Sequence, residues 1–442
     1  MSRGFRLLWG AEASSKLGSS ITGVALPLIA VTTLNATAFQ STLLYAATWL
    51  PWLLIGLPAG AWVDRLRRRP VMIACDLVSA LLFLSIPVAA WLGVLTLGQL
   101  LAVSVAAGAA AVFFQTANQA YLPSLLTSSE LARGNAVLHG TESTMQVAGP
   151  GIAGVIVHLV GAASAVLVDA FSFAVSALCL TAIRHRERRP AREQTRLGKD
   201  VIEGIRFVAR DPYLRVLTGY GAASNIGLIG YQSLLVVFLV RDVGVGGSTV
   251  GVLIAAISCG GVLGAAVATP LSRRVGTARA MLLCEMGATP FGLLIPMTRP
   301  GAGLTLLVVG GAVIGVGVVA GNVVKAAFRQ QYTPPRLLGR VVVSMQFLNL
   351  GAVPLGALIA GGLATAIGTR PAMWCMTGGL ALTGLILLIG PLKRRRDLPV
   401  SALGETPADA VERQVDGTAA DGLSAVDGEP VGSTVVPLPS RG

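Results

Sequence analysis

The sequence of 442 residues contains little charge: 12% of its residues are Asp, Glu, Lys or Arg, whereas 53% are apolar. A soluble domain of this length needs far more charge to stay dispersed, so the composition argues against a soluble protein. Histidine is also scarce, and His139, His158 and His185 are too scattered to form a metal-ligand cluster. We therefore expect neither a bound metal nor a cofactor.

Cysteine is equally rare, and the five residues lie in apolar segments without metal-ligand spacing. They are expected to be small buried hydrophobes: Cys75, Cys179, Cys259, Cys284 and Cys375. The sequence has no G-x-x-x-x-G-K-[ST] loop, which argues against direct use of ATP. It also shows no catalytic cluster of the His/Asp metal or Ser-His kind, so we do not expect an enzyme.

Long apolar segments, in contrast, fill the sequence nearly from end to end. About 20 apolar residues in a helix cross a bilayer, because a helix satisfies its backbone hydrogen bonds within its own segment. The predicted spans are residues 7–33, 40–62, 71–91, 96–119, 135–159, 161–183, 213–240, 249–270, 278–298, 302–325, 341–365 and 371–391. The 54 glycines suit such a fold, since small residues let helices approach closely in lipid. The prediction is an all-α membrane protein with twelve transmembrane helices in two six-helix bundles.

The positions of the basic residues predict the orientation. Lys and Arg accumulate in short cytoplasmic loops of membrane proteins. With both termini in the cytoplasm, the outward loops hold only Arg241, Arg299 and Arg370, Lys16 lies inside a span, and the other 30 of 34 bases are cytoplasmic. Moving the frame by one helix inverts this asymmetry. We therefore predict a multi-pass protein of the inner (plasma) membrane with both termini inside.

The chain divides into four parts. Residues 1–183 and 213–396 are the predicted bundles, and residues 184–212 form a basic connector in which apolar residues recur at helical spacing: Leu197, Val201, Ile205 and Val208. This pattern indicates a helix on the inner leaflet, with a regulatory partner helix as the alternative. Residues 397–442 carry eight acids against two bases and are expected to be a disordered acidic tail. The bases beside the spans are expected to meet anionic lipid headgroups, not nucleic acid.

Three local matches indicate that the two halves are related. MIACDL, with Asp76, aligns with MLLCEM, with Glu285, at an offset of 209 residues. NQAYLP (118–123) aligns with RQQYTP (329–334), and AGPGIAG (148–154) with AVPLGAL (352–358). Two similar bundles can rock against each other around a site near the midplane of the membrane. The repeat therefore favours a transporter, and we expect it to be a monomer.

The loop between the second and third spans resembles the major facilitator superfamily signature G-x-x-x-D-R-x-G-R-R/K. Five residues fit this pattern: Gly60, Asp64, Arg65, Arg68 and Arg69. Arg67 stands where the second glycine is usual. The resemblance implies that Asp64 engages a helix end in the other half, while the arginines pair with acids such as Asp76 to latch one conformation. The alternative is an ordinary basic cytoplasmic loop.

The fifth span contains Gly149, Pro150 and Gly154, which resemble the G-P-x-x-G-G element of antiporters in that superfamily, with Ala153 in place of one glycine. The opening LLWGAEASSKLGSSITGVALPLIAV and the connector IRFVARDPYLRVL are similar to the macrolide-efflux and enterobactin-exporter branch of drug:proton antiporters. The resemblance covers residues 5–395. It implies alternating-access export of a small amphipathic or hydrophobic compound (drug, antibiotic, secondary metabolite or siderophore) in exchange for protons. The alternatives are an importer or lipid mover of the same fold, and a receptor or scaffold that does not transport.

Ionisable residues inside spans are costly and usually face a cavity or a partner. Glu12 and Lys16 are four residues apart and can pair on one helix, while Ser19 stands where the family often has an acid. Either these residues line a cavity that includes a proton site, or Glu12 and Lys16 form an ion pair near the mouth of that cavity. Asp169 and Glu142 are further proton or substrate candidates, with a hydrogen bond between helices as the alternative.

Six amides could orient a substrate or bond neighbouring helices. These weaker candidates are Gln115, Asn118, Asn225, Gln232, Gln346 and Asn349.

Overall fold

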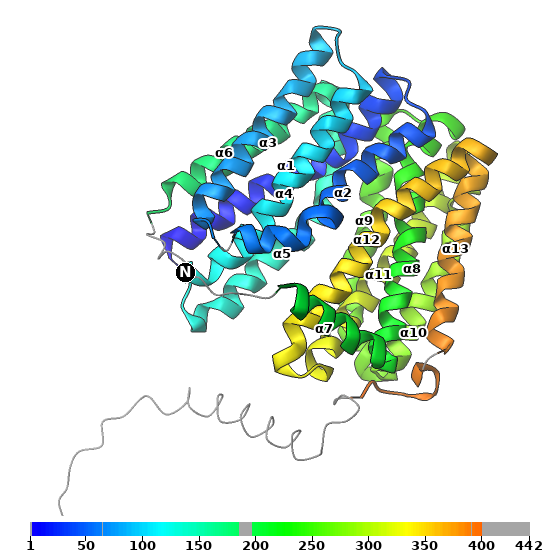
Figure 1. Cartoon of the computed structure of the whole chain (residues 1–442). Coiled ribbons are helices and arrows are strands. Elements are labelled where there is room, and N and C mark those ends of the chain that lie inside the picture. The colour runs from blue at the N-terminus through cyan, green and yellow to red at the C-terminus, as the bar shows by residue number, and fades with distance from the viewer. Residues whose placement is uncertain (1, 64, 185–196, 390, 400–442) are drawn as a thin grey trace, which may run out of the picture.

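The computed structural model describes residues 2–63, 65–184, 197–389 and 391–399. Within these ranges every regular element is helical (Figure 1). The first half contains α1 (Arg3–Leu28), α2 (Ala38–Val63), α3 (Arg68–Trp91), α4 (Leu97–Leu125), α5 (Ser128–Val160) and α6 (Ala162–Ala182). The second half contains α7 (Leu197–Arg210), α8 (Pro212–Val237), α9 (Gly247–Val275), α10 (Thr277–Ala288), α11 (Leu304–Tyr332), α12 (Pro335–Ile367) and α13 (Thr369–Ile389). The short helices are η1 (Ile29–Thr33), η2 (Phe238–Asp242), η3 (Thr289–Leu294), η4 (Gly301–Gly303) and η5 (Pro391–Arg394).

Four of the six pairs of equivalent helices have the same length, whereas α3 has 24 residues and α10 has 12. α1 and α8 have 26 residues each, and both continue into a five-residue π-helical turn, η1 and η2. α4 and α11 have 29 residues, α5 and α12 have 33, and α6 and α13 have 21. Polar side chains begin several of these helices; Asp211, for example, accepts hydrogen bonds from the backbone N–H groups of Tyr213 and Leu214 at 2.9 Å.

The two halves meet at one end of the molecule and separate at the other (Figure 1). One apolar cluster joins buried residues of both halves, among them Ile21 and Leu44 of the first and Tyr231 and Val250 of the second. At the end that holds the N-terminus and α7, each half has its own apolar cluster. Most contacts between the halves come from α5 against α9 and α2 against α12. The described structure is therefore open at the end that contains α7.

Glycines allow the closest approach between the halves. A Cβ added to Gly154 of α5 would lie 2.6 Å from the Cα of Gly251 of α9, so only residues without a side chain fit there. On the closed side, Arg241 also donates a hydrogen bond to the carbonyl of Ala36 across the halves, at 2.7 Å. Backbone and small residues therefore make the closest part of this contact.

Nine helices among the described residues are long and apolar enough to cross a bilayer. The span predicted at 278–298 differs: α10 ends at Ala288, and a 3₁₀ segment with Pro290 follows, because proline cannot supply a helical backbone N–H. In α5 the apolar segment found among the described residues is Ala148–Val160. α7 packs against α12, where Gly204 lies close to the carbonyl of Arg340. Part of α7 is therefore covered by protein, in addition to the expected contact with the leaflet.

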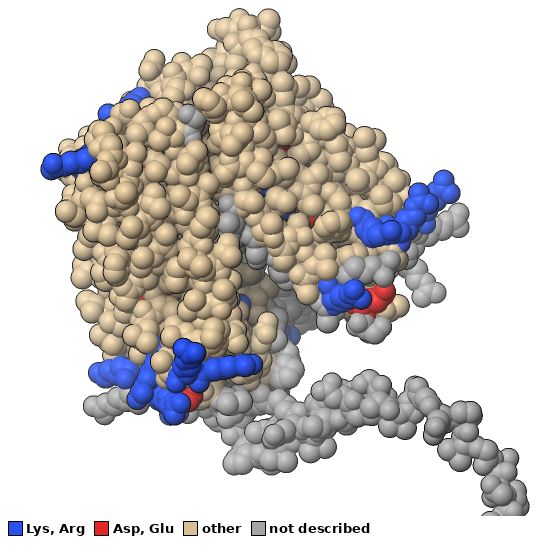
Figure 2. Space-filling view, turned by 180° about the vertical axis from the view of Figure 1, so that it is seen from behind, with Lys and Arg blue, Asp and Glu red and all other residues tan. Residues whose placement is uncertain are grey.

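Basic residues gather at the lower edges of both halves in Figure 2, while most of the visible surface is uncharged. Residues 185–196 of the predicted connector and 400–442 of the predicted tail lie outside the described residues.

The contact at Gly154 gives a first prediction. Gly154→Val places a branched side chain against Gly251, and we expect it to destabilise the protein by about 1–3 kcal/mol through overpacking. Gly140→Val on the same helix is the matched control, because a Cβ at Gly140 meets no atom within 4 Å. Apparent melting temperatures of the detergent-purified proteins provide the measurement. Equal melting temperatures for the two variants would show that the contact is not tight.

Candidate functional site

A cavity of about 510 Å³ lies between α1, α2, α3, α4 and α6 of the first half. Its polar lining includes Glu12, Ser15, Lys16, Ser19, Thr22, Asp76, Ser79, Ser104, Gln115 and Asp169. Its aromatic lining consists of Tyr45, Trp49, Trp52, Phe83, Phe114 and Phe173. These are six of the 24 aromatic residues in the chain. A volume of this size suits a small organic molecule, and the lining offers apolar faces beside a few polar groups.

Of the two alternatives for Glu12 and Lys16, cavity lining is the one that the structure shows, and both side chains contact other helices. The Lys16 ammonium lies 2.9 Å from a carboxylate oxygen of Glu142 on α5, and both side chains are about one-third exposed. The buried Glu12 carboxylate instead accepts a hydrogen bond from the amide of Asn118 on α4. Residue spacing shows which side chains share a face of a helix, but it does not show which partner a neighbouring helix brings to that face.

Asp169 on α6 is fully buried at the wall of the cavity. One carboxylate oxygen accepts a hydrogen bond from the Ser172 hydroxyl at 3.2 Å, and the other has no hydrogen-bond partner in the described part of the chain. Gly18 of α1 makes room for this carboxylate, since a Cβ at that position would lie 2.3 Å from it. A buried carboxylate with one unsatisfied oxygen is unstable as a bare anion, so it requires a proton or a cation.

Asp76 on α3 also lines the cavity, and its carboxylate accepts a hydrogen bond from the Ser176 hydroxyl at 2.6 Å. This position differs from the expected pairing with the loop arginines. Arg69 donates to the carbonyls of Leu180 and Thr181 at the end of α6, at 2.7 and 2.5 Å. Asp76 lies about two helical turns from that loop along α3, so it points toward α6 and the cavity.

The remaining residues of the predicted latch surround the α2–α3 turn. Gly60 and Arg68 are half-buried, and Arg65 is exposed. Asp64, the central residue of the predicted latch, lies outside the described residues.

The predicted antiporter element lies between the halves. Gly149 faces Ser20 of α1, where a Cβ would approach the Ser20 hydroxyl to 2.4 Å, and Gly154 faces α9. Pro150 is half-buried between them. The element therefore joins the cavity helix α1 to the opposite half.

The amides divide between the halves. Gln115 lines the cavity, and Asn118 bonds Glu12 beside it. In the second half, Asn225 donates to the backbone carbonyl of Asn349 at 3.1 Å, which joins α8 to α12. Gln232 and Gln346 are exposed. The structure thus brings the first-half amides to the cavity.

A buried charged cluster in the second half was missed by sequence reasoning. The Lys325 ammonium of α11 lies 2.6 Å from the Glu285 carboxylate of α10, and the Tyr220 hydroxyl of α8 donates to that carboxylate. Glu285 is 2% exposed and packs against Gly321, where a Cβ would lie 2.1 Å from its oxygen. The predicted span ended at Lys325, which placed this residue in the cytoplasm, but α11 continues for seven residues to Tyr332. The alignment of Glu285 with Asp76 in the internal repeat was the sequence signal that could have revealed this cluster.

The fold and the cavity define a membrane protein of two packed helical bundles with a solute-sized polar and aromatic site. No group of metal-binding side chains was found among the described residues.

Comparison with known proteins supports this class of membrane protein. Residues 1–422 match the family described as transmembrane secretion effector, of the major facilitator superfamily. The chain is 29% identical over 406 residues to the multidrug efflux pump Tap of Mycolicibacterium fortuitum, which covers 89% of this chain and 97% of that protein. It is also similar to Tap of Mycobacterium tuberculosis H37Rv, with 27% identity over 425 residues, 92% of this chain and 98% of that protein.

Solved structures show the same fold at low identity. A bacterial homologue of the iron transporter ferroportin in its inward-facing state superimposes with a TM-score of 0.72, at 15% identity, over 89% of this chain and all of that chain. The chain belongs to the transmembrane secretion effector family of the major facilitator superfamily. It is therefore a multi-pass transporter of the inner membrane and not an enzyme.

The second-half cluster yields a stability prediction. Lys325→Met leaves the buried Glu285 carboxylate without its counter-charge, and we expect a loss of about 3–5 kcal/mol. The double variant Lys325→Met/Glu285→Gln removes both charges and is expected to regain most of that stability. Thermal unfolding of the purified proteins measures both. If Lys325→Met alone unfolds at the wild-type temperature, the pair does not neutralise a buried charge.

Proposed function

We propose that this protein is a drug-efflux transporter that exports small amphipathic or hydrophobic compounds by alternating access, driven by proton entry. The observation that carries this proposal is the aromatic and acidic cavity inside one of two bundles, which share an apolar cluster at one end of the described structure. A cavity between helices that can rock relative to the other half is suited to bind on one side and release on the other.

The proposal includes twelve membrane spans with both termini in the cytoplasm. α2, α5 and the α10–η3 segment would then cross the membrane in addition to the nine apolar helices. The gathering of basic residues at the end of the molecule that contains α7 supports this orientation. In that frame, the described structure is open to the cytoplasm, which is where an exporter collects its substrate.

Two observations support export as the direction. The Tap relatives are multidrug efflux pumps by name. The element of Gly149, Pro150 and Gly154, which resembles the antiporter element, lies at the contact of α5 with α1 and α9. This is where a change in packing would move one half relative to the other.

The lining of the cavity indicates the substrate class. Three carboxylates, those of Glu12, Asp76 and Asp169, line it together with one ammonium, Lys16, which is already paired with Glu142. Aromatic rings attract apolar and cationic groups, and uncompensated carboxylates attract cations. The cavity therefore favours amphipathic compounds that carry a positive charge on an apolar, preferably aromatic, body.

Glu12 and Asp169 are the proposed proton carriers. Both are buried, both line the cavity, and each has few hydrogen-bond partners for a carboxylate. The proposed latch of Asp64 with Arg65 and Arg68 would hold one conformation at the cytoplasmic end. The protein would act as a monomer, since the cavity is complete within one chain.

A transport assay tests the proposed drive. Inverted membrane vesicles that contain the wild-type protein are expected to accumulate a fluorescent hydrophobic cation, and a protonophore should abolish the accumulation. Glu12→Gln or Asp169→Asn should reduce the rate at least tenfold, because the neutral side chain can no longer exchange a proton. Asp242→Asn is the matched control: this acid is exposed in η2, outside the cavity.

Wild-type accumulation that persists with protonophore would contradict proton coupling. Accumulation only in right-side-out vesicles would contradict export and favour an importer of the same fold.

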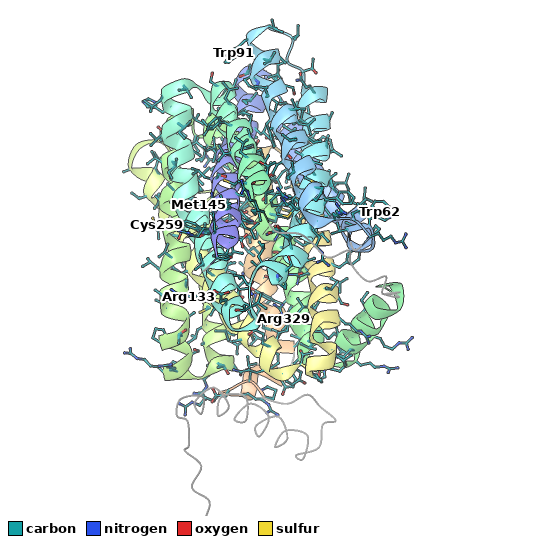
Figure 3. The ribbon with its side chains drawn as sticks, turned by 90° about the vertical axis from the view of Figure 1, so that its left-hand side faces the viewer. Trp62, Trp91, Arg133, Met145, Cys259 and Arg329 are labelled. Carbon is teal, nitrogen blue, oxygen red and sulfur yellow. The ribbon has the colours of Figure 1, made fainter. Side chains whose placement is uncertain are left out.

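A second assay tests the aromatic lining. Trp49→Ala or Trp52→Ala removes a ring from the cavity wall, and we expect the half-saturating dye concentration to rise about 3- to 10-fold. Trp91→Ala serves as the control, because this side chain is 64% exposed at the end of α3 (Figure 3). A similar change in all three variants would show that the rings do not bind the substrate.

A further inference from the structure

A second recess lies on the outside of the second half, at the turn between α9 and α10 (Val275–Thr277). Its volume is about 690 Å³. Its lining comprises Arg274, Val275, Arg279, Leu282, Leu283, Met286, Gly287 and Arg396. This recess shares no residue with the cavity of the first half.

The lining is divided into a cationic end and an apolar wall. Arg279, Leu282, Leu283, Met286 and Gly287 recur at intervals of three and four residues, so they form one face of α10. The arginine stands in the first turn of the helix, and the apolar residues follow along the membrane-spanning direction. Leu283 is 56% exposed, and a Cβ at Gly287 would meet no atom within 4 Å, so no described residue covers this wall.

The cationic end is built from three separate segments. Arg274 comes from the end of α9, Arg279 from α10 and Arg396 from the chain after α13. The last segment is anchored: the carbonyl of Arg396 accepts a hydrogen bond from the backbone N–H of Ala278 at 3.1 Å. Asp397 next to it accepts from the backbone N–H of Thr277 at 2.9 Å. The fold therefore holds a third guanidinium next to the other two.

Three guanidinium groups around one recess repel one another unless an anion lies between them. Asp397 approaches Arg396 to 4.0 Å, at the limit of an ion pair, with both side chains more than 60% exposed. Among the described residues, no carboxylate lies within 4 Å of Arg274 or Arg279. Within the described residues, the recess thus combines unpaired positive charge with an apolar wall on α10, which belongs to a membrane span in the proposed topology.

We propose that this recess binds one anionic phospholipid. Its phosphate headgroup would lie among Arg274, Arg279 and Arg396, and an acyl chain would run along Leu283 and Gly287 of α10. Basic pockets beside membrane helices recognise such headgroups by charge, and the apolar wall matches the chains. A soluble phosphate would contact only the arginines, whereas a phospholipid would also contact the apolar wall. The wall therefore distinguishes a lipid headgroup from a free phosphate.

Lipid binding to the purified full-length chain tests the proposal. Native mass spectrometry of the protein in detergent, titrated with phosphatidylglycerol, is expected to show a first bound lipid that phosphatidylcholine with the same acyl chains does not replace. The triple variant R274Q/R279Q/R396Q should weaken this first binding about tenfold or more. The matched control R206Q/R210Q/R215Q removes three exposed arginines from α7 and α8 and should bind as the wild type does.

The apolar wall has its own test. Gly287→Trp fills the path of the acyl chain without changing charge and should also weaken phosphatidylglycerol binding, whereas soluble glycerol phosphate should not compete with the lipid. Equal weakening in the triple variant of the recess and in the control triple variant would overturn the proposal, because general surface charge would then explain binding. Full competition by glycerol phosphate would also overturn it, since the recess would be an anion site only.

Discussion

The contact between α5 and α9 at Gly154 and Gly251 is the constraint on which the described arrangement depends. Without side chains there, two backbones touch, and a single apolar cluster can join both halves at that end. The halves then need no contact at the other end, where each keeps its own core. The separation of the halves at that end follows from this arrangement.

The internal repeat supplies two similar scaffolds that carry different chemistry. Asp76 in the first half meets a serine and borders the cavity, whereas its counterpart Glu285 is neutralised by Lys325 and covered by Tyr220. One buried acid is left available to a ligand, and the other is fixed by a permanent counter-ion. Because a closed ion pair can exchange little with a solute, the second half is suited to act as the rigid partner and the first half as the binding half.

The all-helical membrane fold was predictable from sequence, because long apolar segments predict membrane-spanning helices. The count of twelve spans and the orientation of the termini stay predictions. The site was less predictable. The acids of the first half were recognised because any charge in a span stands out, but the partners of Glu12 and Lys16 depend on how α1 rotates against α4 and α5. Lys325 was missed because the polar end of α11 resembles a loop. The end of α10 was missed because Pro290 changes the helix type within an apolar segment. Rotation and helix ends are tertiary properties that residue spacing does not encode.

On the proposed function, the negative charge of the cavity couples substrate and proton without a separate device. Asp169 has one carboxylate oxygen without a partner in the described structure, and Glu12 has a single amide donor. In a poorly solvated wall, each carboxylate is stable only when a proton or a cationic ligand neutralises it. On the proposed function, arrival of a cationic substrate therefore favours proton release, and protonation from the outer side favours release of the substrate. Exchange then follows from the cost of a bare buried charge, and the direction of transport follows from the side on which protons are more abundant.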